Sequence, residues 1–174
     1  MKNHFLALFF TTLASNVIFT AHAADGTINF TGEILEQACE VDAGSKSQTV
    51  ALGKVSKNAF SSAGDTAAAT SFDIKLSKCP GALSTASVKF EGTPNATDNN
   101  VLALNQETGA ATGVGVKLYN VDGSALPLSK GSQSFPLVKG GTTTLNFKSA
   151  YVATNTTVTP GPANAVAKFS VIYN

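Results

Sequence analysis

Residues 26–35 read GTINFTGEIL, and their apolar side chains recur at every second position. Ile28, Phe30 and Ile34 share one parity with Gly32, whereas threonine, asparagine and glutamate occupy the other parity. Alternation over this many residues predicts a half-buried strand whose apolar row enters a core. A glycine inside a strand marks a bulge or the close approach of another backbone. A first strand packed on its own sandwich is the commonest such arrangement, but the pattern alone leaves the receiving core open.

Upstream of this stretch, residues 1–23 have the features of a secretory signal peptide. Lys2 provides the positive start, an apolar region follows, and Ala21-His22-Ala23 forms a small-x-small cleavage site. The predicted mature chain therefore begins at Ala24. A membrane anchor is the alternative, but a spanning helix needs about 20 mostly apolar residues. Threonine, serine and asparagine interrupt the apolar region here, which favours the signal peptide.

Downstream, Cys39 and Cys79 are the only two cysteines of the chain. Exported proteins keep their disulfides, and an even number of cysteines fits a disulfide framework. We therefore predict that these two residues are joined. A bond that closes a loop of this length, about 40 residues, would stabilise the fold by roughly 4 kcal/mol in the chain-entropy model.

The composition argues against several classes of function. The chain has 12 basic and 11 acidic residues, and none of the basic residues is arginine. It therefore lacks both the basic patch and the bidentate phosphate ligands with which proteins bind nucleic acids. Both histidines lie in the predicted signal peptide, which leaves the mature chain without the usual general base or zinc ligand. The acidic residues Glu33, Glu36, Glu40 and Asp42 are better explained as a solvated surface than as a glycosidase dyad. We expect no enzyme, no metal and no cofactor.

Beyond Cys39, short strand patterns alternate with turns rich in Gly, Pro, Asn and Asp. Residues 42–45 predict a polar turn and residues 57–69 a loop, while Pro136 restricts its segment to a sheet edge at best. Short strands at roughly ten-residue intervals predict an all-β sandwich in one domain. The expected strands cover residues 48–55, 71–79, 87–91, 101–104, 113–119, 134–138, 142–153 and 165–173.

Both ends of the predicted mature chain carry a further pattern. Residues 24–55 read ADGTINFTGEILEQACEVDAGSKSQTVALGKV, an alternating arm with a glycine, then a cysteine, a turn and a strand ending near Leu-Gly. Residues 160–174 read PGPANAVAKFSVIYN, with Tyr173 penultimate and Gly161 fourteenth from the end. Together these features resemble the subunits of chaperone–usher fimbriae, and most closely the major rod subunit of type 1 fimbriae. The short arm before Gly26 also resembles tip-fibrillum subunits, so the rod and minor subunit types both stay open.

The resemblance implies an incomplete immunoglobulin-like sandwich over residues 37–174, which lacks its last strand, and an N-terminal donor-strand arm over residues 24–36. In such subunits the arm fills the groove of a neighbour, and the C-terminal strand borders the groove that receives a strand. The donor strand would comprise Ile28, Phe30, Gly32 and Ile34. The groove and chaperone-binding strand would comprise Gly161, Phe169, Val171 and Tyr173.

The same resemblance implies a structural subunit of a bacterial fimbria that supports cell adhesion. Subunits of this kind are exported to the periplasm, bound by a chaperone, passed through an outer-membrane usher and polymerised outside the cell by donor-strand exchange. The expected partners are neighbouring pilin subunits, the periplasmic chaperone, the usher and tip subunits. A two-domain tip adhesin would need a lectin domain for which this length leaves no room. A self-complete binding module and a secreted enzyme are the remaining alternatives.

Overall fold

The computed structural model describes residues 25–174, so the predicted signal peptide lies outside the described residues. The described residues fall into two units, residues 25–34 and residues 35–174. No helix in the described part of the chain is long and apolar enough to cross a membrane.

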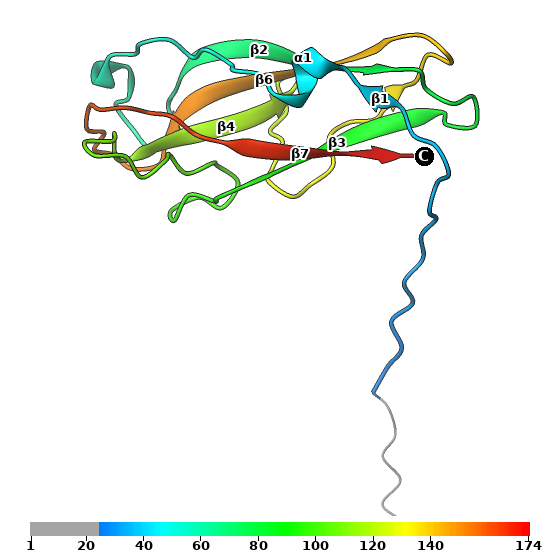
Figure 1. Ribbon diagram of the computed structural model, residues 1–174. Coiled ribbons are helices and arrows are strands. Elements are labelled where there is room, and N and C mark those ends of the chain that lie inside the picture. Colours follow the sequence, from blue (N-terminus) through cyan, green and yellow to red (C-terminus); the bar gives the residue numbers. More distant parts are fainter. Residues whose placement is uncertain (1–24) are drawn as a thin grey trace, which may run out of the picture. The chain divides into compact units, whose positions relative to one another are not determined.

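The larger unit is built from two antiparallel sheets (Figure 1). The first has the order β1-β2-β6-β4, with β1 at Glu40–Val41, β2 at Thr66–Ser77, β6 at Thr143–Ala153 and β4 at Val114–Asn120. The second has the order β5-β3-β7, with β5 at Phe135–Pro136, β3 at Thr85–Gly92 and β7 at Ala167–Tyr173. Two short helical segments, α1 at Ala43–Lys46 and η1 at Lys57–Ala59, complete the described elements. The predicted all-β sandwich is confirmed.

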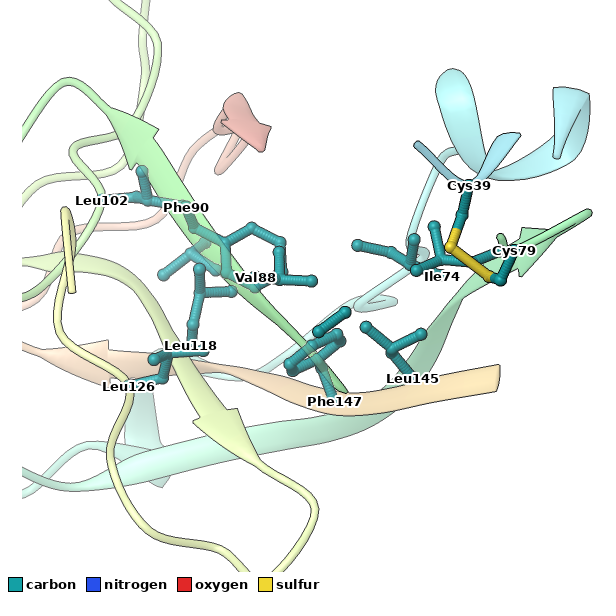
Figure 2. Packing of buried hydrophobic residues seen from close by; sticks show 13 residues of the cluster. Cys39, Ile74, Cys79, Val88, Phe90, Leu102, Leu118, Leu126, Leu145 and Phe147 are labelled. Atoms are coloured by element: carbon teal, nitrogen blue, oxygen red, sulfur yellow. A yellow bond between two sulfur atoms is a disulfide. The ribbon is translucent and has the colours of Figure 1, made fainter. Parts of the chain in front are cut away.

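The core lies between the two sheets because alternate residues of each strand point inward (Figure 2). Ile74 and Leu145 are fully buried, and burying such a side chain stabilises a fold by about 1.5–3 kcal/mol. Phe147 of β6 joins the sheets through aromatic contacts. Its ring centroid lies 5.1 Å from that of Phe90 on β3 and 5.6 Å from that of Phe72 on β2.

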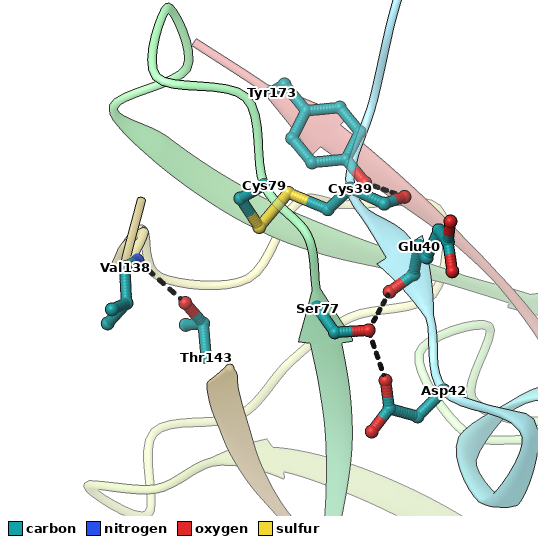
Figure 3. The surroundings of a disulfide bond; sticks show 8 residues. All are labelled: Cys39, Glu40, Asp42, Ser77, Cys79, Val138, Thr143 and Tyr173. Atoms are coloured by element: carbon teal, nitrogen blue, oxygen red, sulfur yellow. Dashed lines mark hydrogen bonds between the residues drawn. A yellow bond between two sulfur atoms is a disulfide. The ribbon is translucent and has the colours of Figure 1, made fainter. Parts of the chain in front are cut away.

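The disulfide predicted from the cysteine pair is present between Cys39 and Cys79 (Figure 3). It ties the chain just before β1 to the residues that follow β2, and both cysteines are buried. The Tyr173 hydroxyl donates to the Cys39 carbonyl over 3.4 Å, and the Ser77 hydroxyl donates to Asp42 over 2.6 Å. The end of the last strand and the beginning of the first therefore meet at the disulfide.

Three segments predicted as strands do not form strands in the structure. Residues 26–35 alternate and residues 48–55 were expected as a strand, yet neither has a ladder partner in the described chain. Alternation reports which side chains prefer burial, whereas a strand also needs a neighbouring backbone to share its hydrogen bonds. Residues 101–104 likewise form only isolated bridges, from Leu102 to Pro94 and Val116.

The predicted polar turn at residues 42–45 is instead the short helix α1. The Asp42 carbonyl accepts hydrogen bonds from the backbone nitrogens of Ser45 and Lys46, and the buried Ser45 hydroxyl accepts from the backbone nitrogen of Lys75. Fixing Ser45 against β2 explains why the turn closes into a helix. Pro136 lies in β5, which pairs with β3 alone, so the predicted edge position is confirmed.

Candidate functional site: an open groove beside the last strand

The second sheet ends at β7, which leaves one edge of that strand open. β7 pairs with β3 along its whole length, and no other strand among residues 25–174 pairs with it. Phe169, Val171 and Tyr173 are half-buried and pack against the core, whereas the residues between them are exposed. The open edge therefore presents unpaired backbone groups directly beside apolar side chains, which is a template for another strand.

An open groove of about 1140 Å³ runs along this edge. One wall is the chain from Ala163 to Phe169, and the other is formed by residues 45–53. Phe72, Phe90 and Leu118 contribute to its floor, so the groove reaches the same core that the two sheets enclose. Apolar side chains exposed along a hollow of this size are a binding surface for apolar groups.

Polar contacts fix the end of the groove where the chain approaches β7. The Tyr151 hydroxyl donates to the Ala163 carbonyl over 3.0 Å, and the Asn164 side-chain amide donates to Glu107 over 3.2 Å. Burial raises the pKa of the Tyr151 hydroxyl above its usual value of 10.0, which extends the pH range over which the group is a donor. These bonds hold residues 163–164 in place as part of the groove wall.

Gly161 does not line the groove but lies behind its wall. A side chain there would meet the Gly109 carbonyl oxygen, the Ala111 nitrogen at 2.6 Å and the Ala110 carbonyl carbon at 2.7 Å. The Ala111 nitrogen also donates to the Pro162 carbonyl. Gly161 is therefore needed because two backbone segments approach each other closely, and it positions the chain that leads into β7.

In the smaller unit, the described residues 25–34 expose their alternating row. The side chains of Ile28, Phe30 and Ile34 are 78%, 92% and 98% exposed, and an added side chain at Gly32 would have no atom within 4 Å. Exposing a row of large apolar side chains to water is unfavourable. The exposure therefore indicates that this row is a binding surface for another apolar surface.

The predicted site residues thus fall into two sets. Phe169 lines the groove, Val171 and Tyr173 continue its strand against the core, and Gly161 supports the wall from behind. The row Ile28, Phe30, Gly32 and Ile34 belongs to the other unit. Sequence reasoning missed the wall formed by residues 45–53, which has no ladder to identify it. It also missed the alternating alanines 163, 165 and 167, a row of small residues that leaves room beside the floor.

The two β-sheets, with the edge of β7 open beside an apolar groove, define an immunoglobulin-like sandwich. A family model described as fimbrial protein matches residues 28–174. The probable major fimbrial subunit LpfA of Escherichia coli O157:H7 is 38% identical over 174 residues, covering 99% of this chain and 97% of that protein.

Two further comparisons agree. The type-1 fimbrial protein A chain of Escherichia coli K12 is 43% identical over 152 residues, covering 85% of this chain and 83% of that protein. Among solved structures, a chaperone–usher pilus subunit shares the fold with a TM-score of 0.64 and 22% identity, over 89% of this chain and 99% of that one.

The chain therefore belongs to the fimbrial protein family and is a structural subunit of a pilus. Subunits of this family are structural proteins that assemble with other pilin subunits into fimbriae on the cell surface.

Proposed function

We propose that this chain is a pilin that polymerises by donor-strand exchange, with the exposed row of one copy filling the groove of the next. The open edge of β7 above the groove is the observation that carries the proposal. A strand added to an open edge gains backbone hydrogen bonds from the edge and side-chain contacts from the groove. Burying Ile28, Phe30 and Ile34 would contribute about 5–9 kcal/mol at 1.5–3 kcal/mol each.

Such a contact joins two different surfaces, the donor segment and the acceptor groove. Heterologous contacts that do not close on themselves build open filaments, which is the form of a pilus. Each subunit donates residues 24–36 and accepts at its groove, so one kind of contact suffices for a homopolymer. The sandwich of residues 37–174 stays incomplete until it receives a strand.

The proposal extends to the route of export. An open edge above an apolar groove is an aggregation hazard before assembly. A periplasmic chaperone that lends its own strand removes that hazard, and Phe169, Val171 and Tyr173 form the edge it would bind. The signal peptide of residues 1–23 would deliver the chain to the periplasm, and an outer-membrane usher would exchange the chaperone for the next subunit. The fibre, capped by tip subunits, would then support adhesion outside the cell.

Deletion of residues 24–35 tests the proposal. The deleted chain, co-expressed with its chaperone, should fold, remain in a chaperone complex and accept a neighbour's strand without donating one. Added to full-length chains, it should shorten the SDS-resistant ladder because each copy ends a fibre. A full-length chain that elutes as a monomer with no ladder would favour the self-complete binding module. Failure of the deleted chain to fold would place the strand in its own sandwich.

A further inference from the structure

The groove wall that leads into β7 has no ladder to hold it in place. β7 begins at Ala167, which pairs with Gly92 on β3, and residues 161–166 pair with no strand in the part of the chain that the structure describes. A stretch of backbone without a ladder samples many conformations unless other contacts restrict it. Contacts from outside the two sheets must therefore keep this wall beside the floor of the groove.

The loop of residues 105–111 supplies those contacts. The backbone nitrogen of Asn105 donates to the Asn164 carbonyl over 2.7 Å, and that of Ala111 donates to the Pro162 carbonyl over 2.9 Å. Within the described chain this loop has no ladder either, so the loop and the wall depend on each other for their positions. Breaking a contact between them should therefore loosen both segments.

Glu107 joins the two segments through its side chain. Its two carboxylate oxygens lie 3.2 and 3.4 Å from the side-chain nitrogen of Asn164, which donates to them. A tight turn fixes the position of Glu107, because its nitrogen donates to the Asn105 carbonyl over 2.9 Å and its carbonyl accepts from the nitrogen of Ala110 over 3.0 Å. Hydrogen bonds to a carboxylate are stronger than those between neutral groups.

We propose that Glu107 is a positioning residue for strand acceptance, and that through Asn164 it holds residues 163–166 as a preformed wall of the empty groove. Strand acceptance is the proposed function, on which this role of Glu107 rests. Both Glu107 and Asn164 line the groove, so the contact lies where an incoming strand meets the wall.

A preformed wall affects the capture of a strand more than its release. A groove with a mobile wall is competent to bind for only part of the time, and the capture rate falls by that fraction. A strand that is already seated holds the wall through its own hydrogen bonds and side-chain contacts. Loss of the Glu107 contact should therefore slow capture and leave release nearly unchanged, a split that a general loss of stability would not produce.

A fluorescent peptide of residues 24–36 measures both rates on full-length subunits. The subunits are held in their chaperone complex and mixed with excess peptide, and fluorescence anisotropy follows capture and release. Glu107→Ala should slow capture by about two- to tenfold, the range that one hydrogen bond supplies. Glu107→Gln keeps an acceptor oxygen and should capture at close to the unsubstituted rate. Gln106→Ala, an exposed neighbour in the same loop, is the matched control and should change neither rate.

An exchange of the two groups tests whether they meet. Asn164→Asp places a second carboxylate beside Glu107 and should slow capture at low salt, and added salt should reduce the slowing. The double variant Glu107→Gln/Asn164→Asp changes neither side-chain length and restores one donor to one acceptor. It should recover most of the unsubstituted capture rate. If the double variant captures as slowly as Asn164→Asp alone, the two side chains do not meet and the inference is overturned.

The remaining outcomes are equally definite. Capture by Glu107→Ala at the unsubstituted rate overturns the inference and leaves the proposed function intact. Unchanged capture with faster release also overturns it, because the contact would then act on the filled groove. If Glu107→Ala yields no chaperone complex, the exchange variants decide the question. If unsubstituted subunits capture no peptide, the proposed function itself fails.

Discussion

Gly161 shows how a single residue can serve a site without lining it. Its position requires the absence of a side chain because backbone atoms of residues 109–111 occupy the space. Gly161→Ala should lower the free energy of unfolding by about 1–3 kcal/mol, the usual cost of overpacking. Gly44 is a matched control, since an added side chain there meets no atom within 4 Å. Urea unfolding of the chaperone-free subunits measures both, and an unchanged midpoint for Gly161→Ala would contradict the expectation.

The tyrosines give the subunit a pH dependence on the alkaline side. Burial raises the pKa of the Tyr151 hydroxyl above its usual 10.0, so the folded state holds this proton more tightly than the unfolded state. Its contribution to stability is complete below pH 10 and is lost as pH rises through the folded value. Tyr151→Phe should therefore flatten the fall in unfolding free energy above pH 10. Urea unfolding at pH 8 and pH 11 checks this, and identical slopes in both chains would refute it.

At the scale of elements, sequence periodicity located the strands that have ladder partners. It also predicted strands in segments that have no ladder partner and form none. Residues 142–153 were expected as a strand and form β6 at Thr143–Ala153, because their apolar alternation matches a face buried between the two sheets. Residues 48–55 were also expected as a strand, but residues 48–53 line the groove and the segment pairs with no strand in the described chain. The Cys39–Cys79 bond followed from the predicted export of the chain and its even number of cysteines. The groove could not be predicted from the sequence, because the wall of residues 45–53 and the row of alanines become a groove only where these segments meet in space.

The strand β7 is the element on which a chaperone would act. Replacing Phe169 and Tyr173 together by serine removes two apolar side chains from the groove edge, and Tyr173→Ser also removes the hydrogen bond to Cys39. The double variant should lose chaperone capture and be degraded in the periplasm, which co-purification and immunoblotting would measure. Ser170→Ala, on the outward face of the same strand, should be captured normally. Undiminished co-purification of the double variant would show that the chaperone binds elsewhere.

At the scale of the whole molecule, the disulfide should matter for the acceptor more than for the donor. Cys39 and Cys79 join the first strand to the end of β2, close to the end of β7. Cys39→Ser/Cys79→Ser should reduce the yield of chaperone-bound subunit, because the chain-entropy model assigns the bond roughly 4 kcal/mol. Quantifying the complex by gel filtration measures this. Free thiol detected by alkylation in unsubstituted fibres would show that the bond is not part of the assembled protein.

We expect assembly to depend on Gly32, a residue that the described fold does not pack. Gly32 has open space around it in the described chain, so Gly32→Val should leave the subunit folded and chaperone-bound. If the segment packed in its own sandwich, valine would be neutral or mildly stabilising because it favours strands. In a neighbour's groove, a β-branched side chain at this position would overpack the contact at a cost of about 1–3 kcal/mol or more.

The two arrangements therefore predict effects of opposite sign for the same substitution. We expect Gly32→Val to block or sharply slow fibre growth, measured by electron microscopy and by the SDS-resistant ladder. Thr31→Val introduces the same side chain one position away, on the outward row, and should assemble at close to the unsubstituted rate. Fibres of normal length from Gly32→Val would show that this stretch does not enter a neighbour's groove, and donor-strand exchange through residues 24–36 would have to be abandoned for this chain.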